Sequence, residues 1–88
     1  MDVVIKGSLI NNIDDFHRII KRQLNFPEYY GENLDALWDS VRCIDLPCRV
    51  IWEDHKLSRE YLSGYFDKVR ELFDEAQMEV EGFKIVYK

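Results

Sequence analysis

The sequence predicts a single α/β domain in which about four α-helices pack on a three-stranded parallel β-sheet. Three short apolar runs, at residues 3–5, 48–52 and 83–87, are rich in β-branched and aromatic residues, which is typical of buried strands. The long segments between these runs carry apolar residues at helical spacing, and such helical crossovers connect parallel strands, normally with right-handed geometry. A chain of 88 residues corresponds to one domain, residues 1–88.

The first strand is predicted to end at Gly7 and Ser8. Asn12 is a good N-cap for the helix that follows, with Asp15 three residues later in a position that resembles a capping box. Phe26 and Pro27 end this helix, because the residue before proline avoids the helical conformation. Its apolar face is predicted to consist of Ile13, Phe16, Ile19, Ile20 and Leu24.

Asn33 is predicted to cap a second helix. Its apolar stripe consists of Leu34, Leu37, Trp38 and Val41, and the flank beside the stripe carries Asp35, Asp39 and Arg42. Leu34 and Trp38 are therefore expected to serve mainly in packing. The strand from Cys48 to Trp52 follows Pro47 and is predicted to be buried on both faces, because its apolar residues are nearly consecutive.

In the last part of the chain, Ser58 is predicted to cap a short helical turn that Ser63 and Gly64 close. A longer helix follows and is predicted to end at Gly82. Its apolar positions are Phe66, Val69, Leu72, Phe73 and Ala76.

The net charge of −5 argues against a nucleic-acid backbone or an anionic membrane as partner. The acidic residues are concentrated in two segments. Residues 28–45 contain five acidic side chains against Arg42 alone, and residues 74–81 contain four acidic side chains and no basic one. The rest of the chain is slightly basic, which suggests an acidic surface on an otherwise balanced body.

The N-terminal residues lack the basic and apolar regions of a signal peptide, and no apolar segment is long enough to span a bilayer. We therefore expect a cytoplasmic protein. Cys43 and Cys48 have a spacing that matches neither a redox motif nor a zinc motif, so both are expected to be reduced thiols. No metal or other cofactor is expected.

The sequence favours a protein that is not an enzyme. His17 lies at the border of the first helix's apolar face, where a hydrogen-bonded boundary residue is commoner than a catalytic base, and His55 is expected to be solvated in a polar loop. Asp35 and Asp39 could form a carboxylate pair, but an exposed helix flank provides no environment that separates their pKa values. No hydrolase, zinc-protease or phosphate-loop motif is present.

The segment FPEYYGENLDALWD, residues 26–39, is better explained as a binding surface. Tyrosines are favoured at interfaces, and Gly31 permits a close approach or a positive φ. Neighbouring carboxylates without cations are useful if the cations come from a partner. The alternative is that one tyrosine fills the edge of the core and that the aspartates form a solvated face.

This segment closely resembles the signature of the barstar family of intracellular ribonuclease inhibitors. The resemblance covers nearly the whole chain, because DDFHRIIKRQL resembles the family's first helix and FDEAQME fits a pattern in its last helix. It implies a non-catalytic inhibitor that binds a basic, extracellular-type ribonuclease 1:1, covers its active site and mimics RNA phosphates. It also implies a monomer when free.

The resemblance further implies a set of contact residues. Asp39 corresponds to the central carboxylate, which takes the place of a phosphate among cations, and Tyr29 to an aromatic that packs on a catalytic histidine. Glu75 corresponds to an acidic contact on the last helix, which would join the two acidic segments into one face. The full set of expected partner-binding residues is Tyr29, Tyr30, Gly31, Asn33, Asp35, Trp38, Asp39 and Glu75.

The loop VRCIDLP, residues 41–47, departs from the family pattern. It is shorter, contains no tryptophan and places Arg42 beside the acidic face. These differences suggest a different cognate ribonuclease. The alternative function is that of an acidic binding or immunity module that docks another basic partner without blocking an active site.

Overall fold

The computed structural model describes all 88 residues and contains one three-stranded sheet with four α-helices and a short 3-10 helix. All strands are parallel and their spatial order is β1-β2-β3. This arrangement confirms the predicted fold class. The elements are β1 (Asp2–Lys6), η1 (Gly7–Leu9), α1 (Ile13–Gln23), α2 (Leu34–Val41), β2 (Cys48–Glu53), α3 (His55–Leu62), α4 (Gly64–Glu79) and β3 (Phe83–Tyr87).

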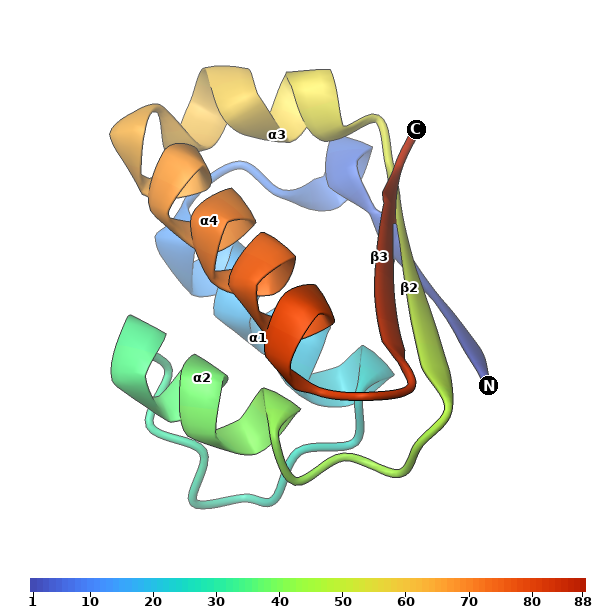
Figure 1. The fold of residues 1–88 in the computed structure, drawn as a ribbon. Coiled ribbons are helices and arrows are strands. Elements are labelled where there is room, and N and C mark those ends of the chain that lie inside the picture. Colours follow the sequence, from blue (N-terminus) through green and yellow to red (C-terminus); the bar gives the residue numbers. More distant parts are fainter.

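The helices lie on one side of the sheet, as Figure 1 shows. Both crossovers step in the same direction across the sheet, and crossovers of one hand that do so place their helices on the same face. The prediction that the second strand is buried on both faces was wrong. Cys48, Val50 and Trp52 are buried, whereas Arg49 is exposed and Ile51 is half-buried on the open face.

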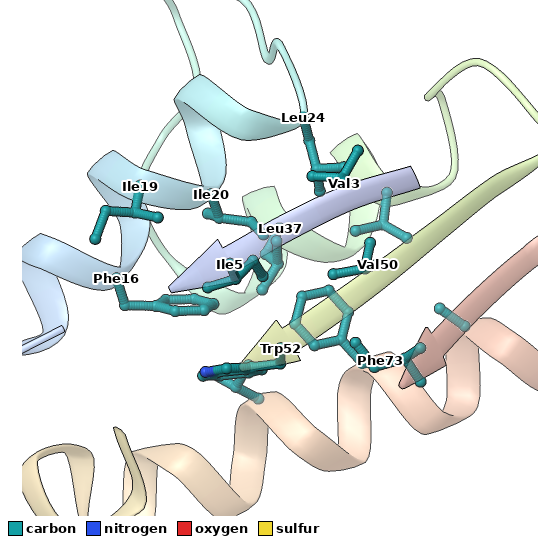
Figure 2. Packing of buried hydrophobic residues seen from close by; sticks show 14 of the residues in the cluster. Val3, Ile5, Phe16, Ile19, Ile20, Leu24, Leu37, Val50, Trp52 and Phe73 are labelled. Atoms are coloured by element: carbon teal, nitrogen blue, oxygen red, sulfur yellow. The ribbon is translucent and has the colours of Figure 1, made fainter. Parts of the chain in front are cut away.

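Trp52 lies at the centre of the core between the sheet and the helices (Figure 2). Its ring stacks on Phe16 of α1 at a centroid distance of 5.4 Å and meets Phe66 of α4 at 5.2 Å. Phe73 lies about two helical turns after Phe66 on α4 and makes an edge contact with the same ring at a centroid distance of 6.0 Å. One aromatic side chain of β2 thus joins the two helices that cover the sheet.

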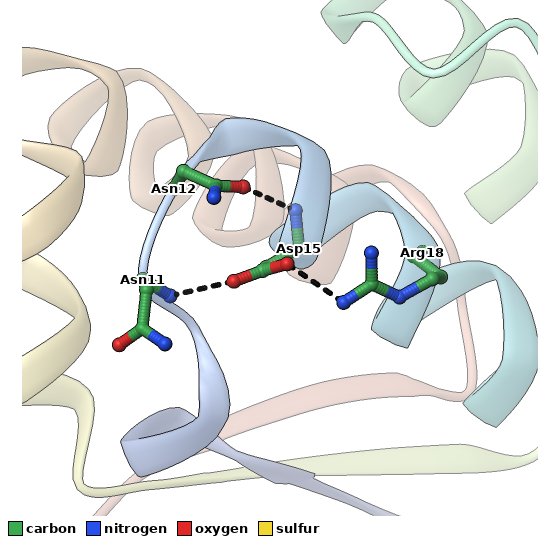
Figure 3. Close-up of polar contacts among 4 residues, drawn as sticks. All are labelled: Asn11, Asn12, Asp15 and Arg18. Carbon is green, nitrogen blue, oxygen red and sulfur yellow. Dashed lines mark hydrogen bonds and ion pairs between the residues drawn. The ribbon is translucent and has the colours of Figure 1, made fainter.

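Asn12 caps α1 as predicted, whereas the return hydrogen bond of the capping box goes to the residue before the cap (Figure 3). The Asn12 side chain accepts a hydrogen bond from the Asp15 amide at 2.7 Å, and the Asp15 carboxylate accepts from the Asn11 amide at 3.1 Å. The apolar face differs from the prediction in two places. Ile13, the first residue of the helix, is exposed, and His17 is fully buried rather than at the border.

Helix α3 begins at His55, so the prediction that Ser58 caps it was wrong. Ser58 is buried, and its hydroxyl donates to the Gly7 carbonyl at 3.1 Å and accepts from the Trp52 indole at 3.0 Å. Gly7 must be a glycine here, because a Cβ atom would lie 2.3 Å from the Glu53 carbonyl oxygen.

His55 is half-buried and donates from Nδ1 to the Lys88 carbonyl at 2.9 Å, so the prediction of a solvated loop histidine was also wrong. The segment after α4 differs only slightly from the sequence prediction. The helix ends at Glu79, and Gly82 adopts a φ of 93° in the turn into β3.

Candidate partner-binding surface

The two adjacent tyrosines of the loop before α2 have opposite environments. Tyr29 is 87% exposed, whereas Tyr30 is 6% exposed and packs on Phe26 at a centroid distance of 4.9 Å. The Tyr30 amide donates to the Pro27 carbonyl at 2.9 Å, which fixes a tight turn. The side chain of Tyr29 is therefore available to a partner. The Tyr30 side chain belongs to the core of the free protein, and its contact with a partner stays a prediction.

Gly31 and Asn33 shape the start of α2. The Asn33 side chain accepts from the Ala36 amide at 2.8 Å, as predicted for an N-cap, and donates to the Gly31 carbonyl at 3.1 Å. A Cβ atom on Gly31 would lie 3.2 Å from the Asn33 side chain, so glycine lets the loop close onto the helix. The positive φ considered for Gly31 occurs at Glu32 instead, with a φ of 51°.

Helices α2 and α4 contact each other and enclose a groove of about 710 Å³. Two carboxylates come from α2 and three from α4, whereas two cations line the same groove. The acidic residues are Asp35, Asp39, Glu71, Glu75 and Glu79, and the basic ones are Arg42 and Lys68. The structure therefore brings together the expected contacts Asp35, Trp38, Asp39 and Glu75.

None of the groove's carboxylates forms an ion pair within the protein. The four ion pairs of the chain involve Asp2, Asp15, Glu28 and Asp74, all outside the groove. Arg42 places its guanidinium over the Trp38 ring at 5.7 Å and does not pair with an acidic residue. An array of unpaired carboxylates is favourable only where solvent or an external cation surrounds it.

Asp39 lines both this groove and a second pocket of about 560 Å³. Tyr29 lines the second pocket, together with Ser40 and Cys43 from the end of α2. Asp39 therefore connects the exposed tyrosine on one side with the carboxylates of α4 on the other. Trp38 is half-buried and packs on the core, in agreement with its predicted packing role.

The second acidic segment is divided between two surfaces. Glu75 and Glu79 line the groove, but Asp74 accepts a hydrogen bond from the Tyr87 hydroxyl at 3.0 Å. Glu71 and Lys68 were missed by the sequence analysis. Glu71, Glu75 and Glu79 recur every four residues on α4, and this spacing places them on one helix face.

Cys43 is exposed and Cys48 is buried, and both are free thiols. Burial raises the pKa of the Cys48 thiol.

No group of three or more histidine, cysteine, aspartate or glutamate side chains has the geometry to hold a metal ion. None of the helices combines the length and the apolar character that crossing a membrane requires.

Two comparisons with known proteins identify the family of this chain. The family model described as "Barstar (barnase inhibitor)" matches residues 1–88. A Bacillus subtilis (strain 168) protein named "Putative ribonuclease inhibitor YrdF" is 41% identical over 86 residues, which cover 96% of this chain and 94% of the relative. Both descriptions concern inhibitors rather than enzymes, in agreement with the sequence analysis. The match over the full length shows that this chain belongs to the barstar family.

Proposed function

We propose that this protein is a stoichiometric inhibitor of a basic ribonuclease, which it binds 1:1 with α2, the Tyr29 loop and the facing side of α4. The family match and the name of the Bacillus subtilis relative support the general role. The arrangement of Asp39, Tyr29 and the groove supports the mode of binding.

The observation that carries the proposal is the absence of internal partners for the groove's five carboxylates. A ribonuclease must hold RNA phosphates with cationic side chains, and carboxylates on a rigid helix can occupy the same positions. A charge buried at an interface is tolerated only if it is paired, so the partner must supply several cations there. Asp39 lies at the centre of this surface and would be the most deeply buried contact.

The exposed ring of Tyr29 complements the charges. It is a large and rigid side chain that can cover an apolar or imidazole surface beside the cations. Occlusion of the active site by this surface needs no cofactor. The proposal also implies a monomer in the free state and action in the cytoplasm, where an active ribonuclease would cleave the cell's RNA.

The direct test is a titration of RNA cleavage by barnase, the ribonuclease in the family's description. We expect cleavage to fall linearly and to stop at one inhibitor per enzyme. The control is the Asp39→Ala variant, which should require a large excess. Formation of a complex in which barnase still cleaves RNA would favour the alternative, an acidic module that docks away from the active site. The absence of any complex would show that barnase is not the cognate enzyme, and absence of inhibition in the same titration with a basic ribonuclease of the producing organism would contradict the proposal.

A further inference from the structure

The two edges of the sheet have no role in the candidate partner-binding surface, because no residue of β1 or β3 lines the groove or the second pocket. The strand order β1-β2-β3 makes β1 and β3 the edge strands (Figure 1). A strand at an edge presents a row of unpaired backbone N–H and C=O groups, which can pair with a strand of another chain. The side chains that cover these groups therefore decide whether the sheet can extend.

One glutamine side chain bonds to the middle residue of each edge strand. On β1, the Gln23 side chain donates from Nε2 to the Val4 carbonyl at 2.7 Å. On β3, the Gln77 side chain accepts at Oε1 from the Ile85 amide at 2.9 Å. Val4 and Ile85 are each the third of the five residues in their strand. The two bonds thus occupy the centre of both edges, one by covering an acceptor and the other by covering a donor.

Both glutamines come from the C-terminal turn of a helix that covers the sheet. Gln23 is the last residue of α1, which contacts β1, and Gln77 lies two residues before the end of α4, which contacts β3. Both residues are exposed. A long polar side chain on an exposed helix position is usually free in solvent, because ordering it costs conformational entropy. Here both side chains instead lie against the edge of the neighbouring strand.

The stability of the fold gives only a weak reason for these bonds. The Gln23–Val4 bond is exposed, so water would satisfy the Val4 carbonyl if the glutamine were absent. The net contribution of such a bond to folding is small, because it replaces a hydrogen bond to water. A side chain anchored on a helix differs from water in one respect, because it also occupies the space that an added strand would need.

The chain closes a further part of the β3 edge by itself. The Phe83 amide donates to the Val80 carbonyl at 3.1 Å in the turn before the strand. Together with the bond from Ile85 to Gln77, this contact uses the amides of the first and third residues of β3. The β3 edge is therefore blocked over its first half, and Gln77 supplies the more central of the two contacts.

We propose that Gln23 and Gln77, the blocking glutamines, prevent the sheet from pairing edge to edge with a second copy of this chain. Identical edge strands can pair antiparallel about a two-fold axis, and such a pairing must displace the same glutamine in both copies. The inference concerns the free protein and does not depend on the inhibition of a ribonuclease.

The test replaces each glutamine by both a cationic and an anionic residue. At Gln23 the side chain must donate, so Gln23→Lys keeps the contact and Gln23→Glu removes it. At Gln77 the side chain must accept, so Gln77→Glu keeps the contact and Gln77→Lys removes it. Amide hydrogen exchange checks the second pair directly. The protection of the Ile85 amide should fall in Gln77→Lys and persist in Gln77→Glu.

Self-association is measured by sedimentation equilibrium up to millimolar protein, beside the urea midpoint of each variant. We expect the dimer dissociation constants of Gln23→Glu and Gln77→Lys to be roughly tenfold lower than that of the wild type, because two hydrogen bonds no longer have to be broken. Gln23→Lys and Gln77→Glu should match the wild type. New protection of the Val4 amide in dimers of Gln23→Glu would place the contact at the β1 edge.

Changes of stability or of charge would produce different orders of association. Both sites lie near a helix C-terminus, where lysine is favoured over glutamate, so an effect of stability would make the two glutamate variants associate most. The chain carries a net charge of −5, so an effect of charge repulsion would make the two lysine variants associate most. Either of these orders, equal association in all four variants, or unchanged exchange of the Ile85 amide in Gln77→Lys would overturn the inference.

Discussion

Replacing Asp39 by alanine should separate binding from stability, because the two free energies are expected to change in opposite directions. In the free protein Asp39 is exposed on α2 and forms no ion pair. Alanine is the better helix former by about 0.5 kcal/mol. Its introduction also removes a like-charge contact with Asp35 one turn earlier, worth about 0.2–0.5 kcal/mol. The free energy of unfolding should therefore stay unchanged or rise by up to about 1 kcal/mol.

Binding should weaken strongly in the same variant. Truncation of a carboxylate that is buried against several cations leaves them unpaired, at a cost of about 2–5 kcal/mol, a range that includes data from the barnase–barstar complex and is therefore carried over from the family. At 1.4 kcal/mol per factor of ten, this corresponds to a loss of affinity of about 30-fold to several thousand-fold. Most of this loss of affinity should come from a higher dissociation rate constant.

The assay combines a urea midpoint with an inhibition constant for barnase, both on the same preparation. Glu60→Ala is a suitable control, because it removes one exposed, unpaired helix carboxylate of α3 outside the groove and changes the net charge equally. The control should bind nearly as well as the wild type. If Asp39→Ala loses stability but inhibits normally, Asp39 serves the fold and the surface has been assigned incorrectly.

Three further predictions concern other parts of the molecule. The association rate constant should fall steeply as the ionic strength rises, because the unpaired carboxylates attract a basic partner. An association rate constant that does not change with ionic strength would show that these carboxylates do not face the partner as the complex forms. Trp38→Phe should lower the free energy of unfolding by on the order of 1 kcal/mol, which is more than it weakens the free energy of binding; unchanged stability with lost inhibition would contradict its packing role. A thiol reagent at pH 8 should modify Cys43 quickly and Cys48 only on unfolding, and equal rates would contradict the burial of Cys48.

The fold could be predicted from the sequence because its signals are local. The spacing of apolar residues and the caps Asn12 and Asn33 reflect interactions within a few residues, and the structure confirms both caps. The roles of Ser58 and His17 could not be predicted in this way. Each is a polar residue whose partners lie far away in the sequence, such as Gly7 for Ser58 and Tyr65 for His17.

The tyrosine pair shows the same limit at the candidate site. Sequence alone allowed one of the two tyrosines to fill the core but did not decide which one. The decision depends on the position of His17, thirteen residues before Tyr30, whose ring forms a buried hydrogen bond with the Tyr30 hydroxyl and none with Tyr29. Resemblance to a family predicts that Tyr29 is a contact, but only the packing explains why its neighbour is not exposed beside it.

The candidate surface as a whole follows from the order of the strands. Helix α2 lies in the first crossover and α4 in the second, so their carboxylates can share a groove only if both crossovers cover the same face of the sheet. The order β1-β2-β3 with parallel strands meets this condition, because both crossovers then step in the same direction. An order with β1 in the centre would reverse one step and place α2 and α4 on opposite faces. Periodicity identifies the helices but not this order, so the joining of the two acidic segments is a property of the topology and not of either segment alone.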